Sequence, residues 1–171
     1  LNALLPADIA IRSVREVDAG AHCRFDALSR RYRYHLHSRK EPLLEDRSWF
    51  YPYPLDAALL EAAASLVAVH TDFTSFSKRN TQVKTFNCKV VLSRWQQEPR
   101  GNWTYEIEAN RFLRGMVRGL VGSMLRLARN GMSWQAFEQL LREPVQASAD
   151  FSAPPQGLFL EAVQFPERIF K

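Results

Sequence analysis

A chain of 171 residues with 46% hydrophobic content can bury a sizeable core. This excludes a disordered tail and predicts a single domain over residues 1–171, or one large piece of a two-part domain. The formal charge of +5 is concentrated in residues 70–130, which carry a net +7, and 18 of the 23 basic residues are arginine. Because arginine binds phosphate with two donors and stacks on bases, this composition favours a nucleic-acid partner.

Strand-like segments alternate apolar and polar positions with a period of two. They cover residues 9–17, 31–37, 87–95 and 103–108. The dipeptide Gly101-Asn102, preceded by Pro99, is a turn signal that joins the last two into an antiparallel hairpin. After Pro154-Pro155, a final strand over residues 158–165 is predicted to return to the sheet.

Helices are predicted over residues 55–69, 111–129 and 134–142. Asn130-Gly131 is a stop signal for the second helix, and Ser133 is a good N-cap for the third. Antiparallel strands mixed with three helices predict an α+β fold, in which helices pack on one face of a mostly antiparallel sheet. A doubly wound parallel sheet fits this pattern less well.

The predicted strand 31–37 has one basic face and one aromatic face. The basic face carries Arg31, Arg33, His35 and His37, and the opposite face carries Tyr32, Tyr34 and Leu36. The two histidines lack a third ligand in an obvious frame, so a solvated or phosphate-facing edge is favoured over a metal site. Core packing explains both tyrosines, and base stacking is the alternative.

The segment 111–129 divides into three stripes at about 100° per residue. The core-facing stripe contains Phe112, Leu113, Met116, Val117, Leu120, Met124, Leu127 and Ala128. Pointing away from it are Arg111, Arg114 and Arg118, with Gly115, Gly119 and Gly122 on a line beside them. An exposed glycine inside a helix costs roughly 1 kcal/mol against alanine. The glycine line therefore predicts close approach of a bulky anion or another backbone, and RNA fits that description.

A solvated basic face, with glycines packed on a sheet or a partner helix, is the alternative for the same segment. No acidic residue occurs between Arg111 and Arg129, and arginines one turn apart repel one another. The groups that neutralise them must therefore come from elsewhere, either as carboxylate or as phosphate.

Several familiar site patterns do not occur in the sequence. Cys23 and Cys88 form no C-x-x-C pair, so neither a zinc knuckle nor a redox pair is predicted. Walker, G-x-G-x-x-G, G-x-S-x-G and H-E-x-x-H motifs do not occur, which argues against nucleotide hydrolysis, dinucleotide binding and the commonest hydrolases. Residues 55–69 are interrupted by polar residues and no signal pattern is seen. We therefore expect a cytoplasmic protein without membrane association.

Six motifs follow one another along the chain. They are L-N-A-L-L-P-A-D-I-A-I from Leu1, H-C-R-F-D-A from His22, R-R-Y-R-Y from Arg30, D-F-T-S-F from Asp72, A-N-R-F-L-R-G-M-V-R-G-L-V-G-S from Ala109 and G-L-F-L from Gly157. Together they resemble the later portion of the tRNA pseudouridine synthase A family. The resemblance implies a homodimeric isomerase that needs no cofactor or metal. Its expected substrate is tRNA, in which it converts uridine to pseudouridine at positions 38 to 40 of the anticodon stem-loop.

The resemblance also implies roles for individual residues. Tyr32 would stack on the flipped uracil, Arg118 would pair with the nucleophilic aspartate, and Leu158 would form an apolar wall. From helical spacing, Arg111 and Arg114 would lie near incoming phosphates. The expected substrate-binding set is completed by Arg24, Arg31, Arg33 and Lys78.

The family's nucleophile belongs to a G-R-T-D-x-G-V-H loop that does not occur in these 171 residues. Asp18, in V-D-A-G-A-H, lacks the Arg-Thr pair of that loop, and Asp26 is interpreted as structural. We therefore expect the larger C-terminal part of a catalytic domain, inactive without an N-terminal segment. The alternatives are a noncatalytic RNA-binding module and a protein-interaction domain whose glycines pack another helix.

Overall fold

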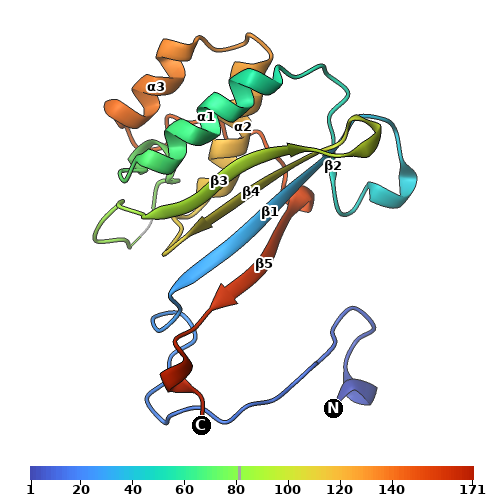
Figure 1. Ribbon diagram of the computed structural model, residues 1–171, viewed down its shortest axis with the longest axis vertical. Helices are drawn as coiled ribbons and strands as arrows, with labels where there is room; N and C mark the ends of the chain where they lie inside the picture. Colours follow the sequence, from blue (N-terminus) through green and yellow to red (C-terminus); the bar gives the residue numbers. More distant parts are fainter. Residues whose placement is uncertain (81) are drawn as a thin grey trace.

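Five strands and three α-helices make up the body of the protein in the computed structural model, which describes residues 1–80 and 82–171 (Figure 1). The strands are β1 (Ser29–His37), β2 (Trp49–Phe50), β3 (Val90–Gln97), β4 (Trp103–Ala109) and β5 (Leu158–Gln164). The helices are α1 (Ala57–Val69), α2 (Met116–Ala128) and α3 (Trp134–Arg142), all on one side of the sheet. This arrangement confirms the predicted α+β fold.

Strand β1 is the centre of the sheet. It pairs antiparallel with β4 along one edge, and on its other edge with β5 and, at its end, with β2. Only the two-residue β2, which was not predicted, runs parallel to its neighbour among the described strands. Strand β3 pairs with β4 as the predicted hairpin, and Arg100 and Gly101 in its turn have left-handed φ values of 64° and 78°.

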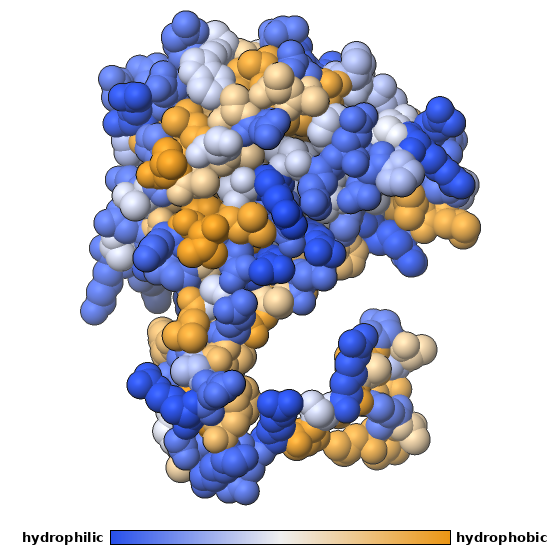
Figure 2. All heavy atoms as spheres, in the orientation of Figure 1, coloured by the Kyte–Doolittle hydropathy of each residue, from blue (hydrophilic) through white to orange (hydrophobic). Residues whose placement is uncertain are grey.

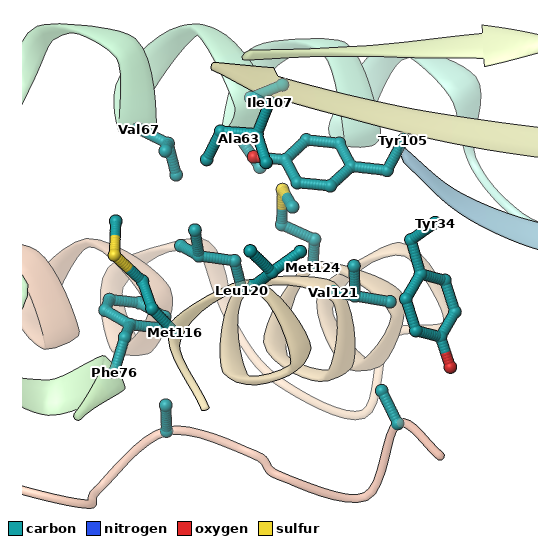
Figure 3. Packing of buried hydrophobic residues seen from close by; sticks show 14 of the residues in the cluster. Tyr34, Ala63, Val67, Phe76, Tyr105, Ile107, Met116, Leu120, Val121 and Met124 are labelled. Atoms are coloured by element: carbon teal, nitrogen blue, oxygen red, sulfur yellow. The ribbon is translucent and has the colours of Figure 1, made fainter. Parts of the chain in front are cut away.

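The core lies between the sheet and the helices (Figure 3). Helix α1 buries Leu60, Ala63, Ala64 and Val67, the one-sided spacing of an amphipathic helix. Leu120 and Met124 of α2 face Tyr105 and Ile107 of β4, and all four side chains are fully buried. Full burial of each such apolar side chain contributes roughly 1.5–3 kcal/mol to folding. The position of α2 over the sheet is therefore fixed by its apolar stripe.

Helix ends follow the local signals in the sequence. The Asp56 side chain accepts a hydrogen bond from the Leu59 amide at 3.0 Å, and Ser133 accepts one from the Ala136 amide at 3.1 Å. Asn130 has a left-handed φ of 57° just after α2. The predicted N-cap of α3 and the predicted stop after α2 are both confirmed.

The start of α2 differs from the prediction. The helix begins at Met116 instead of Arg111, because Gly115 at its N-cap has a left-handed φ of 82° that interrupts any helix running through it. The carbonyl of Arg114 accepts a hydrogen bond from the Lys78 amide at 3.0 Å, which holds this turn in place. Arg111 and Arg114 therefore do not occupy the helical turns preceding Arg118.

The predicted strand over residues 9–17 is also wrong. This segment belongs to an N-terminal arm that extends away from the body, where no neighbouring strand supplies backbone partners (Figures 1 and 2). Val17 alone forms an isolated bridge, to Phe170. The alternating apolar residues remain exposed, with Ile9 53% and Val14 77% accessible. In the described part of the chain, no helix has the length and apolar character needed to cross a bilayer.

Candidate active site

Tyr32 and Tyr34 lie two residues apart in β1, so their side chains share one face of the sheet. This is the face that the helices cover. Tyr34 is fully buried in the core. Tyr32 is half-buried, and its ring lies 5.0 Å from that of Phe112 at an angle of 84°. This edge-on contact holds the Tyr32 ring at the border of the core.

Arg118 meets this face of the sheet at the turn that precedes β5. Its Nε donates to the Ala153 carbonyl at 2.5 Å, and the Tyr34 hydroxyl donates to the next carbonyl, Pro154, at 2.7 Å. Burial raises the pKa of Tyr34, and the positive charge of Arg118 partly opposes that increase. Leu158 pairs with Tyr34 in the β1–β5 register. Arg118 and Leu158 thus converge at Tyr34, on the same sheet face as Tyr32.

The glycine line of α2 has a different explanation from the RNA backbone suggested by the sequence. A Cβ atom on Gly122 would lie 2.3 Å from the carbonyl oxygen of Asp150, and one on Gly119 would lie 2.9 Å from the Phe151 ring. The chain's own residues 150–151 therefore fill this side of the helix. Close approach of another backbone is confirmed, and the interpretation as an RNA contact is wrong.

Two of the predicted substrate-binding cations lie at the beginning of α2. Lys78 is half-buried with its Nζ 5.5 Å from the centre of the Phe151 ring, and its backbone amide binds the Arg114 carbonyl. Arg114 is exposed. Phe151 also packs against Gly119, so both cations border the segment that supplies the Ala153 carbonyl to Arg118.

Arg111 and Arg24 lie near the end of the sheet where β1 begins and β4 ends. The Arg30 guanidinium donates to the carbonyls of both Arg24 and Asn110, which brings these two segments together. Burial raises the pKa of the Cys88 thiol to about 11, and the nearby charge of Arg111 counteracts part of that rise. Arg111 and Arg24 therefore border the helix-covered face of the sheet at the end where Tyr32 and Phe112 lie.

Arg31 and Arg33 do not lie near Tyr32 and Arg118 on the helix-covered face. They lie on the opposite face of β1, where Arg31 pairs with Glu108 at 2.7 Å and Arg33 with Glu106 at 3.3 Å. Arg94 of β3 reaches Glu106 at 2.5 Å. The register that places R-x-R of β1 opposite E-x-E of β4 could have revealed these pairs in the sequence. The geometry therefore gives no support to a phosphate-binding role for Arg31 and Arg33.

The buried carboxylate of Glu106 predicts acid sensitivity. Burial alone would raise its pKa, but the guanidinium groups of Arg94 and Arg33 outweigh this effect and hold the pKa below the usual value. A carboxyl group whose pKa is lower in the folded state stabilises the protein at pH values above its unfolded pKa of about 4.3. This stabilisation is lost as the pH falls through the folded-state pKa. Thermal melts should therefore show stability decreasing below about pH 4.

The same melts on Glu106→Gln should show lower stability at neutral pH and a shallower decrease in acid. Glu16→Gln is the matched control, because Glu16 is 75% exposed in its pair with Lys171. An unchanged acid profile for Glu106→Gln would contradict the assignment.

The two histidines of β1 differ in environment. His35 shares a hydrogen bond with Thr104 at 3.1 Å, whereas His37 is buried next to the Phe50 ring and lies away from solvent. The expectation of a solvated or phosphate-facing edge is therefore wrong for His37. No cluster of three or more His, Cys, Asp or Glu side chains suited to a metal ion occurs in residues 1–80 and 82–171.

The two aspartates considered from the sequence lie outside this arrangement. Asp26 accepts a hydrogen bond from the His22 amide at 2.6 Å, a local turn contact. Asp18 is exposed in the turn before it, where its carbonyl accepts from the Ala21 amide.

Comparison with known proteins gives consistent matches over this chain. A family model described as tRNA pseudouridine synthase matches residues 62–166, which include Arg118 and Leu158. The chain is 40% identical to the tRNA pseudouridine synthase A of Bacteroides fragilis, covering all of this chain and 68% of that protein. It is also 40% identical to the protein of the same name in Porphyromonas gingivalis, with 99% and 68% covered. The corresponding Treponema denticola protein is 35% identical over 179 residues.

Proposed function

Because the chain belongs to the tRNA pseudouridine synthase family, we propose that it carries most of a site that isomerises uridine at positions 38 to 40 of the tRNA anticodon stem-loop. The observation that supports this most directly is the environment of Arg118. Its guanidinium is half-buried, and no carboxylate among the described residues lies within ion-pairing distance of it. Its guanidinium is therefore available to an anionic partner.

The hydrogen bonding of Arg118 indicates what that partner is. Nε is used by the Ala153 carbonyl, which fixes the plane of the guanidinium and leaves the two Nη groups as a fork. Such a fork matches a carboxylate with two parallel hydrogen bonds. Arg118 would thus hold the nucleophilic aspartate of the family ionised and aimed at the target nucleotide.

Tyr32 and Leu158 suit the base of that nucleotide. A uridine flipped out of the stem-loop needs an aromatic face and an apolar wall once its neighbours no longer stack on it. Tyr32 offers the ring, held edge-on by Phe112, and Leu158 offers the wall beside Arg118. The base would then separate from C1′ of the ribose, rotate and rejoin through carbon.

An activity assay tests this proposal. Since the G-R-T-D loop does not occur in the 171 residues, we expect this chain alone to form no pseudouridine in unmodified tRNA, and the full-length protein to do so. Mass spectrometry of the tRNA locates the modified positions. Turnover by the chain alone that Asp18→Ala abolishes would contradict the assignment of the nucleophile. Specific RNA binding without turnover by the full-length protein would instead favour the noncatalytic module.

We also expect the full-length protein to be a homodimer, as the resemblance implies, and to act in the cytoplasm. Light scattering of the full-length protein measures its oligomeric state. A monomer that retains full turnover would contradict the first expectation.

Arg114→Ala is predicted to separate binding from chemistry. Arg114 is exposed beside Lys78 at the start of α2, where a phosphate can reach it without displacing protein contacts. The variant should bind tRNA roughly 5-fold more weakly, and the slope of log K against log salt should decrease by about 1. Turnover at saturating tRNA should remain close to normal. Unchanged affinity with reduced turnover would assign Arg114 to the chemistry instead.

A further inference from the structure

A pocket of about 590 Å³ lies beside the second half of α2, apart from Tyr32 and Arg118. Its walls come from three places: β2 with the residues after it, the C-terminal turns of α2, and the segment 150–152. The volume lies in the range of small-ligand sites. The residues that matter for its chemistry are Trp49, Tyr51, Tyr53, Arg126, Arg129 and Asp150.

One wall is a row of aromatic rings that pack edge to face. Trp49 and Tyr51 have ring centres 4.7 Å apart, and those of Tyr51 and Tyr53 are 5.2 Å apart. The last ring is 48% exposed. The Arg129 guanidinium lies 3.5 Å from the centre of the Tyr53 ring and 5.6 Å from that of Tyr51. An arginine stacked on an exposed tyrosine presents flat surfaces of the kind on which nucleobases stack.

The two arginines of this pocket keep their charge available. Arg126 donates to the Gly131 carbonyl, and Arg129 has a long 3.5 Å contact with the Tyr51 hydroxyl. Neither forms an ion pair with a carboxylate among the described residues, in contrast to Arg31, Arg33 and Arg94 on the sheet. This part of α2 therefore presents uncompensated positive charge next to aromatic surface.

The pocket and the Arg118 site lie along the same helix, with the segment 150–151 packed on α2 between them. Arg118, Gly122 and Arg126 follow one another by single turns of α2, about 12 Å from first to last along the helix axis. The segment that lines the pocket at residues 150 and 152 also supplies the Ala153 carbonyl to Arg118. A strand of RNA that reaches from Arg118 to the pocket therefore passes over the segment 150–152, which covers α2 at Gly119 and Gly122.

Of the described residues that line this pocket, Asp150 is the one with an acidic side chain. One of its oxygens accepts a hydrogen bond from the Ser152 amide at 2.8 Å. A carboxylate repels phosphate but accepts hydrogen bonds from the amino and imino groups of a base. The presence of Asp150 favours a whole nucleotide over a free phosphate ion. In a nucleotide, the polar edge of the base can face the carboxylate while the phosphate faces an arginine.

We propose that the Trp49–Tyr53 and Arg126–Arg129 pocket binds a second nucleotide of the substrate RNA, next to the uridine held at Arg118. The base stacks on the Tyr53–Arg129 pair, and its phosphate lies by Arg126. This inference rests on the proposed function, because the ligand is the same RNA. Its role is to hold the RNA strand on either side of the residue that is flipped.

Fluorescence anisotropy with a labelled anticodon stem-loop RNA tests the pocket. Tyr53→Ala should weaken binding of the 171-residue chain roughly 10-fold, and Tyr53→Phe should bind like the wild type because it keeps the stacking surface. Arg129→Gln should lower the salt slope by about 1. Arg142→Gln is the matched control, since Arg142 is an exposed arginine on α3 that pairs with Glu138. Photocrosslinking from thiouridine in the RNA should label residues 49–53.

The binding results distinguish failure of the pocket proposal from failure of the proposed function. Normal RNA binding by Tyr53→Ala and Arg129→Gln, with weaker binding by Arg114→Ala, overturns the pocket and leaves the proposed function intact. An altered oligomeric state without a change in RNA affinity makes the pocket a protein interface and also overturns it. Absence of RNA binding by both the wild-type chain and the full-length protein overturns both proposals. Thermal melts of each variant establish that it is folded, as expected for two exposed positions.

Discussion

Replacing Arg118 by alanine in the full-length protein is expected to lower turnover about 100-fold or more, while the Kd for tRNA changes little. The reason is the proposed partner: the fork of Arg118 contacts the attacking carboxylate, not the RNA. Without that fork the carboxylate is neither aimed nor kept ionised. Single-turnover pseudouridine formation at saturating tRNA, together with a binding isotherm, separates the two effects.

Arg118 also binds the Ala153 carbonyl, so a structural contribution must be distinguished from a chemical one. Arg118→Lys keeps the positive charge and loses the fork; we expect it to recover part of the stability and little of the turnover. Arg142→Ala on α3 should leave turnover unchanged. Normal turnover at saturation by Arg118→Ala, with weaker tRNA binding, would show that Arg118 contacts the substrate instead.

Gly122→Ala is expected to produce the largest loss of stability of any single methyl addition considered. Its Cβ would lie 2.3 Å from the Asp150 carbonyl oxygen, which belongs to backbone and cannot rotate away. Helix α2 and the segment 150–154 would have to separate. Overpacking of this kind costs roughly 3 kcal/mol, equivalent to a decrease in Tm of about 10 °C for a chain of this size. Thermal or urea unfolding measures it.

Two glycine variants calibrate that result. Gly20→Ala should leave the Tm unchanged, because no atom lies within 4 Å of its added Cβ. Gly119→Ala should fall between the two, since its Cβ meets the edge of the Phe151 ring, which can shift. Equal stability of Gly122→Ala and Gly20→Ala would contradict the close packing of residues 150–151 on α2.

In the site, the identity of the residues could be predicted from sequence motifs, but the contacts that position them could not. The roles expected for Arg118, Tyr32 and Leu158 came from motifs far apart in the sequence, and the fold places these residues on one side of the sheet. The contacts that arrange them were not predicted. Neither the carbonyl of Ala153 nor the edge of Phe112 carries a sequence signal, because any residue has a carbonyl and a core phenylalanine looks like any other.

Short-range signals account for what the sequence alone determined. The cap at Ser133, the stop at Asn130 and the hairpin turn at Gly101 depend on backbone conformations and hydrogen bonds within a few residues. The α+β class followed from the periodicities of the segments between them. These features need no information about distant parts of the chain.

Only the tertiary structure decided what those segments meet. Residues 9–17 have the alternation of a strand, but apart from the single bridge of Val17 to Phe170 no strand pairs with them. Arg31 and Arg33 have the pattern of a phosphate site but face Glu106 and Glu108. The glycines of α2 called for a close neighbour, which proved to be residues 150–151 of the same chain. Periodicity shows that a face needs a partner, whereas the identity of the partner depends on long-range packing, which residue spacing does not encode.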